Sequence, residues 1–186
     1  MMIKIAALPI ILLSALTVAA QKPNDVITKQ IKALRAGKAI TLSYDAAGNT
    51  SKIMVTAENF ADADARRAGI KAMNFGMAVF YPGKELPAVP ETLDFAFWIL
   101  TIKPQFAASH VLKVTLAREM LDLGDARYGA KPRENMEYLN FKISRADLTK
   151  IAAESSVKFK LGGHDFTFTP THLITLKNLL AISDIR

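Results

Sequence analysis

The sequence predicts an α+β domain, a largely antiparallel sheet or curled sandwich of about eight strands with short N-terminal and C-terminal helices. Three observations lead to this class. Segments in which apolar and polar residues alternate fill much of the chain. Segments with helical spacing of apolar residues include one near each end. The middle of the chain lacks the strand–helix–strand order that predicts a parallel sheet.

Residues 1–20 have the pattern of a signal peptide. Lys4 supplies a short positive region, and Ile5–Ala20 is an apolar run of sixteen residues. The small or modest side chains that end this run suit a signal peptidase, so cleavage is expected before Gln21. Residues 21–186 are then expected to form a single exported globular domain.

An uncleaved membrane anchor is the alternative reading of this leader. A spanning helix needs about 20 apolar residues, whereas this run is shorter and is interrupted by Pro9. The mature chain is therefore not expected to span a membrane. With 0 cysteines, no disulfide can stabilise it, which favours a bacterial periplasmic or secreted protein over one from a eukaryotic secretory pathway.

The charge of the chain is positive, with 24 Lys and Arg against 17 Asp and Glu. An anionic envelope surface is therefore a candidate partner. The basic residues are scattered rather than arranged in a stripe with interleaved aromatic residues, which argues against nucleic acid as a partner.

The expected elements follow from hydrophobic periodicity and from turn residues. Helices are expected over 24–36, over 59–68, from Ser144 and from Thr169-Pro170. Residues 122–135 are expected to form a polar loop, and Gly76 is expected to mark a bulge. Strands are expected over 40–45, 53–57, 70–81, 94–102, 112–116, 139–143, 157–161 and 164–168.

The last hairpin has a predicted register, because Gly162-Gly163 can form a two-residue turn. This turn pairs Phe159 with Phe166, and on the opposite face it pairs Lys160 with Asp165. On the apolar face it also pairs Leu161 with His164 and Val157 with Phe168.

Side chains that can bind a metal ion or perform catalysis do not form a convincing motif. The histidines are His110, His164 and His172, and Asp165 adds a carboxylate near two of them. His164 and Asp165 are expected on opposite faces of their strand and His172 exposed on its helix, so no metal site is assigned. Cysteine catalysis is excluded, and the chain has no Gly-x-Ser-x-Gly or Ser-x-x-Lys motif, so no catalytic or cofactor-binding residue is assigned either.

Two further groups have a functional and a structural interpretation. The acidic residues Glu58, Asp62 and Asp64 resemble a calcium loop less than they resemble a solvated helix face. An apolar set either lines a pocket for an apolar ligand or packs an ordinary core, and the core is the favoured reading. This set comprises Met73, Phe75, Met77, Phe95, Phe97 and Trp98.

These observations favour a non-enzymatic, exported binding or interaction module of a bacterial envelope, with an unidentified protein or small molecule as its ligand. A carrier of a small apolar ligand is the first alternative. A hydrolase of envelope polymers that uses two carboxylates is the second.

Overall fold

The computed structural model describes residues 40–57, 60, 63–83 and 90–183. The expected signal peptide over 1–20 and the expected helix over 24–36 lie outside these residues.

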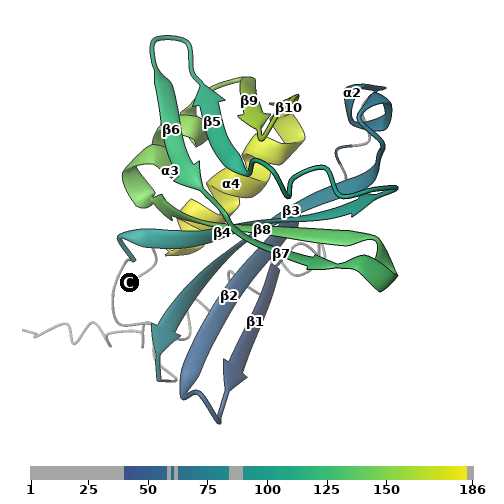
Figure 1. The fold of residues 1–186 in the computed structure, drawn as a ribbon. Coiled ribbons are helices and arrows are strands. Elements are labelled where there is room, and N and C mark those ends of the chain that lie inside the picture. The colour runs from purple at the N-terminus through teal and green to yellow at the C-terminus, as the bar shows by residue number, and fades with distance from the viewer. Residues whose placement is uncertain (1–39, 58–59, 61–62, 84–89, 184–186) are drawn as a thin grey trace, which may run out of the picture.

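Ten strands of the described residues form two antiparallel sheets (Figure 1). The six-stranded sheet has the order β1 (Ile40–Asp45), β2 (Thr50–Ala57), β3 (Ile70–Pro82), β4 (Thr92–Thr101), β8 (Met136–Ser144) and β7 (Arg127–Lys131). The four-stranded sheet has the order β10 (His164–Phe168), β9 (Val157–Leu161), β5 (Val111–Thr115) and β6 (Met120–Asp125). The predicted α+β class and antiparallel architecture are confirmed, with somewhat more strands than expected.

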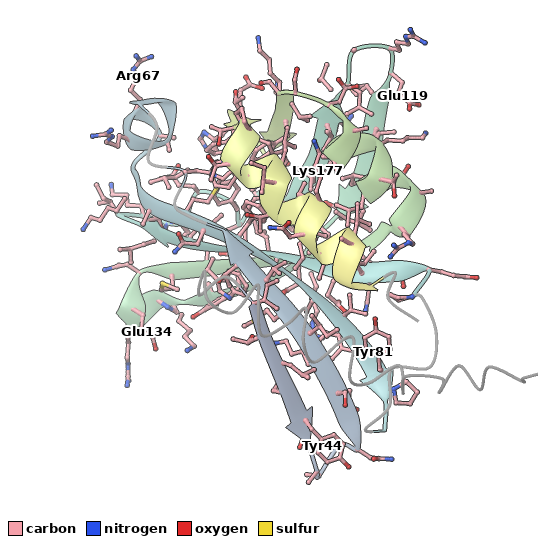
Figure 2. The ribbon with its side chains drawn as sticks, turned by 180° about the vertical axis from the view of Figure 1, so that it is seen from behind. Tyr44, Arg67, Tyr81, Glu119, Glu134 and Lys177 are labelled. Atoms are coloured by element: carbon pink, nitrogen blue, oxygen red, sulfur yellow. The ribbon has the colours of Figure 1, made fainter. Side chains whose placement is uncertain are left out.

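The helices among the described residues are α2 (Ala63–Arg67), α3 (Arg145–Ala153) and α4 (Pro170–Ser183), with a short 3₁₀ turn over Pro132–Glu134. Helix α3 begins as predicted, because the Ser144 hydroxyl accepts a hydrogen bond of 3.0 Å from the Asp147 N–H. Helix α4 contacts β2, β3 and β10, and it also packs against α3. It therefore lies over the inner faces of both sheets (Figures 1 and 2).

The core is formed by aromatic rings from the facing sheets. The Phe97 ring of β4 stacks on the Phe159 ring of β9 with centroids 5.8 Å apart, and Phe75 meets Phe168 edge-on at 5.5 Å. Five members of the apolar set identified in the sequence are buried in this core: Met73, Phe75, Met77, Phe95 and Phe97. Trp98 alternates to the opposite face of the same strand. The six residues therefore do not line one pocket.

The predicted register of the last hairpin is confirmed. Phe159 pairs with Phe166 and both rings are buried, whereas Lys160 pairs with Asp165 on the solvent side. The Lys160 ammonium and the Asp165 carboxylate lie 3.8 Å apart.

The polar loop expected over 122–135 was wrong. This segment holds the end of β6, all of β7 and the 3₁₀ turn. A single residue, Ala126, separates β6 from β7, so the chain passes from one sheet to the other there. The Ala126 N–H donates a 3.1 Å hydrogen bond to the His110 carbonyl oxygen. Asp and Gly in these strands disfavour strand structure locally, and pairing with β5 and β8 overrides that preference.

The bulge expected at Gly76 was also wrong, because the irregularity in β3 lies between Ile70 and Ala72. Gly76 has a different role. A Cβ atom at this position would lie 2.5 Å from the Trp98 Cη2 atom and 3.0 Å from the Val55 carbonyl oxygen. The absence of a side chain thus allows the Trp98 indole to lie against the backbone of β3.

Gly76→Ala is expected to lower the free energy of unfolding by about 1–3 kcal/mol, because the added methyl group must displace the indole. Urea denaturation measures this change. Gly129→Ala is the matched control, since a Cβ there meets nothing within 4 Å. It should stay within about 0.5 kcal/mol of the wild type or be slightly more stable. Equal effects of the two substitutions would contradict the proposed role of Gly76.

Candidate functional site: a lysine-lined groove

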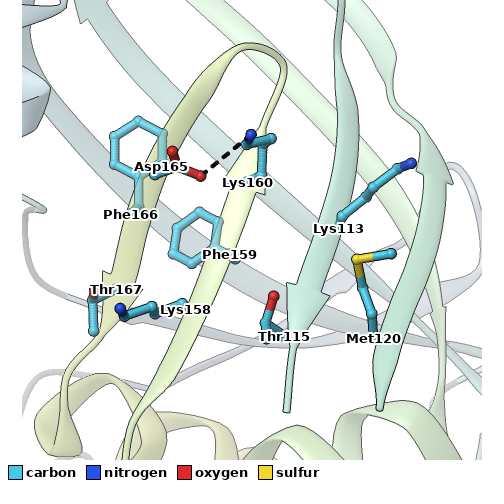
Figure 3. Close-up of a pocket in the computed structure, with 9 residues that line it drawn as sticks. All are labelled: Lys113, Thr115, Met120, Lys158, Phe159, Lys160, Asp165, Phe166 and Thr167. Carbon is cyan, nitrogen blue, oxygen red and sulfur yellow. Dashed lines mark ion pairs between the residues drawn. The ribbon is translucent and has the colours of Figure 1, made fainter.

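A groove with a volume of about 650 Å³ lies on the outward face of the four-stranded sheet. We call it the lysine groove. Figure 3 shows its residues, which come from all four strands of that sheet. The residues that line it are Lys113, Thr115, Met120, Lys158, Phe159, Lys160, Asp165, Phe166 and Thr167.

Strand alternation places the three lysines on one face. In β5, Leu112 and Val114 are fully buried, so Lys113 between them points outward as predicted. In β9 the buried residues alternate with Lys158 and Lys160 in the same way. The antiparallel pairing of β5 with β9 sets Lys113 directly opposite Lys160. Like charges directly opposite each other destabilise a sheet, so the pairing of Lys113 with Lys160 is not explained by the stability of the fold.

Two carboxylates at the edges of the sheet partly balance these charges. Asp122 of β6 lies 3.6 Å from the Lys113 ammonium, and Asp165 of β10 lies 3.8 Å from that of Lys160. Both pairs are solvent-exposed, and such pairs contribute only about 0–1 kcal/mol. Lys158 has no carboxylate within 4.0 Å among the described residues. The centre of the groove is therefore positive.

The other lining residues of the groove suit an anion that also has an apolar part. Thr115 and Thr167 are the register partners of Lys158 on the two neighbouring strands, so their hydroxyl groups lie on the same outward face as the lysines. Met120, the first residue of β6, is 62% exposed, and its flexible thioether can adapt to an apolar ligand. Among the described residues that line the groove, Asp165 is the one carboxylate, and it forms an exposed ion pair with Lys160.

The structure separates the three histidines. His164 is half-buried at the hairpin, where its ring contacts that of Phe106 with centroids 5.5 Å apart. Asp165 points to the other side of the sheet, as predicted. Among the described residues, no group of three His, Asp or Glu side chains is placed to hold a metal ion.

His172 was expected to be exposed on its helix, and this was wrong. Its ring is buried, with its centroid 4.1 Å from that of Phe60. Its Nδ1 atom accepts a 3.1 Å hydrogen bond from the Thr169 N–H, as a Glu or Gln does at this position of a capping box. His172 thus contributes to the start of α4.

A buried carboxylate, Glu137, was missed by the sequence reasoning. Its side chain is 1% exposed and accepts hydrogen bonds from four donors. These donors are the Gln105 N–H at 2.8 Å, the Phe106 N–H at 3.0 Å, the Tyr128 hydroxyl at 3.1 Å and the Thr101 hydroxyl at 3.3 Å. We call the five residues the Glu137 cluster. It holds the segment that leads from β4 toward β5.

The Glu137 cluster also positions the aromatic side chains near the sheet junction. Burial, the hydrogen bond to Glu137 and the charge of that carboxylate raise the pKa of Tyr128, so its hydroxyl stays protonated as a donor at neutral pH. The His110 ring stacks on Tyr128 with centroids 5.6 Å apart, and its Nε2 atom lies 4.0 Å from the Asp125 carboxylate. The Glu137 carboxylate is occupied by donors and shielded from solvent, so its role is structural.

The strand pattern contained a signal for Glu137. Leu139, Phe141 and Ile143 were expected to face inward, and a step of two residues back along β8 reaches Glu137. The acidic group considered for calcium lies largely outside the described residues, which exclude Glu58, Asp62 and the side chain of Asp64.

Glu137→Gln is expected to lower the free energy of unfolding by about 1–3 kcal/mol, because the new NH₂ group faces a buried donor that then lacks an acceptor. Thermal or urea unfolding measures this. Glu134→Gln changes the same group at an exposed position (Figure 2), where its ion pair with Lys131 spans 3.5 Å. The control should stay within about 0.5 kcal/mol of the wild type. A neutral effect of Glu137→Gln would rule out the structural role.

Comparisons with protein-family models, curated proteins and solved structures find no match to this chain. No helix in the described part of the chain is long and apolar enough to cross a membrane. The surfaces of the molecule itself are therefore the basis on which a function can be proposed.

Proposed function

We propose that this protein is a non-enzymatic binding module of a bacterial envelope, exported to the periplasm or secreted, which binds an anionic lipid surface through its lysine groove. The observation that carries the proposal is the direct pairing of Lys113 with Lys160, with Lys158 beside them. A phosphate group placed between these ammonium groups replaces their mutual repulsion by attraction.

The apolar rim supports a lipid headgroup over a free inorganic anion. Met120 lies at the edge of the groove and is largely exposed, so it can contact the acyl boundary while the lysines reach the phosphates. A basic face of this kind is attracted to an anionic membrane by about 1 kcal/mol per lysine. The overall positive charge of the chain acts in the same direction.

The two alternative functions have less support. The hypothesis of a carrier for an apolar ligand was based on a Met- and Phe-rich set, and five members of that set pack in the core. A carboxylate-dependent hydrolase needs two carboxylates that share a cleft, whereas Asp165 is the one carboxylate of the groove lining. Export is supported by the N-terminal pattern of charge, apolar run and small residues.

The combined change Lys113→Ala, Lys158→Ala and Lys160→Ala is expected to weaken binding to phosphatidylglycerol vesicles about 100-fold, as three lysines contribute about 3 kcal/mol. Vesicle co-sedimentation at low and physiological salt measures the loss, with phosphatidylcholine vesicles as the neutral lipid. Wild-type binding should fall as salt rises.

A matched variant removes three exposed lysines elsewhere: Lys71→Ala, Lys103→Ala and Lys177→Ala. It carries the same change in net charge and should retain most of the affinity. Equal losses in both variants would show a non-specific charge effect and overturn the proposed groove.

The mature protein is expected to begin at Gln21 when it is expressed with its leader in a Gram-negative host. Mass spectrometry of the periplasmic and culture fractions measures the N-terminus. A full-length product confined to the cytoplasm would contradict export without affecting the lipid-binding measurement.

A further inference from the structure

A second, smaller pocket of about 140 Å³ lies on the outward face of the six-stranded sheet. We call it the indole pocket. Its floor is formed by Gly76, Ala78 and Ala96, and the Trp98 side chain lies across this floor. The other lining residues are Lys52, Met54, Met77, Phe80, Asp94 and Asn140. It shares no residue with the lysine groove.

Among the described residues on the outward face of the six-stranded sheet, Trp98 is an aromatic side chain without a cation against its ring. The Lys52 ammonium lies 5.5 Å from the centre of the Phe80 ring, and the Lys131 ammonium lies 5.6 Å from that of Tyr138. These cations occupy the neighbouring rings. Within the described residues, Trp98 has neither a cation nor another ring against it.

Two polar side chains of the pocket, those of Trp98 and Asn140, have no hydrogen-bond partner among the described residues. In the described part of the chain, neither the Trp98 indole N–H nor the Asn140 side-chain amide makes a protein hydrogen bond, and neither is sealed from solvent. Buried or half-buried indole N–H groups usually have an acceptor. Asp94 adds a carboxylate at the same edge, held by an ion pair of 2.8 Å with Lys142.

We infer that the indole pocket binds one pyranose ring of an uncharged glycan chain. The C–H face of such a ring is apolar and weakly positive, which matches the negative face of the indole. Its hydroxyl groups both donate and accept hydrogen bonds, as do the indole N–H, the Asn140 amide and the Asp94 carboxylate taken together. A pocket of this size is below the usual range for drug-sized ligands, so it fits one ring of a longer chain.

A protein partner or a second copy of the chain fits this surface less well. Stable protein interfaces bury about 800 Å² on each partner and have an apolar centre with a polar rim. Here the pocket of about 140 Å³ is lined by the ion-paired carboxylate of Asp94 and by the Asn140 amide, which makes no hydrogen bond to the described residues. A protein surface would remove the water that hydrates these polar groups, which costs free energy. The hydroxyl groups of a sugar can take the place of that water as hydrogen-bond partners.

Trp98 is the single tryptophan of the chain, so tryptophan emission, excited at a wavelength that the four tyrosines do not absorb, reports on this pocket alone. Titration of the full chain with cellotetraose, maltotetraose or an N-acetylglucosamine tetramer is expected to give a saturable change in emission with at least one sugar. Asn140→Ala should weaken that binding at least fivefold. Asn178→Ala, on α4, removes the same side chain elsewhere and should bind as the wild type does.

Absence of a change with all three sugars at millimolar concentration would overturn the inference. The inference would also be overturned if the emission changed with protein concentration in the absence of sugar and sedimentation showed a dimer. That result would identify the face as a self-association surface. The variant with three lysines of the groove removed should bind the sugar normally, and Asn140→Ala should bind phosphatidylglycerol vesicles normally. The glycan inference and the proposed lipid-binding function therefore fail separately.

Discussion

The fold depends on one shared aromatic core in which rings from the two sheets meet, as Phe97 meets Phe159 and Phe75 meets Phe168. The chain has no cysteine, so no disulfide adds to the stability that this packing supplies. Each truncation of a buried Phe removes about 3–5 kcal/mol, a large share of the stability of a domain. The core therefore determines which residues of each strand face inward, and the residues that face outward follow from alternation along the strand.

Both candidate binding surfaces are consequences of those outward registers. Leu112 and Val114 must face the core, which leaves Lys113 in solvent opposite Lys160. Phe97 and Ile99 must also face the core, which leaves Trp98 between them on the other side. The charge and the aromatic ring that bind ligands in these proposals thus need little additional structure, because each sheet already presents alternate residues to water.

Sequence reasoning succeeded where local and tertiary preferences agree. The Gly162-Gly163 turn and the alternation on both sides of it determine the hairpin register, and Ser144 caps its helix through a local hydrogen bond. Sequence reasoning failed where the structure of a segment is determined by pairing with another strand rather than by its own residues. The strands β6 and β7 form because β5 and β8 present edges to them, despite Asp and Gly in their sequences.

The same distinction explains the candidate sites. The lysines of the groove could be assigned to solvent from alternation, but the meeting of Lys113 and Lys160 depends on the pairing of β5 with β9 across more than forty residues. Trp98 was grouped with core residues because composition alone does not distinguish the two faces of a strand that is apolar on both. His172 was expected outside because its burial depends on Phe60, a residue distant in sequence whose ring centroid lies 4.1 Å from that of His172.

Ala126 gives the arrangement of the two sheets a mechanical property. A connection of one residue, whose N–H is bonded to the His110 carbonyl, leaves little chain between β6 and β7, and the shared core packs the two sheets against each other. Molecules held on the two outward faces would keep a constant spacing and angle, as on a rigid spacer. The gain in avidity from engaging both would then be set by the shape of the domain rather than by a flexible tether.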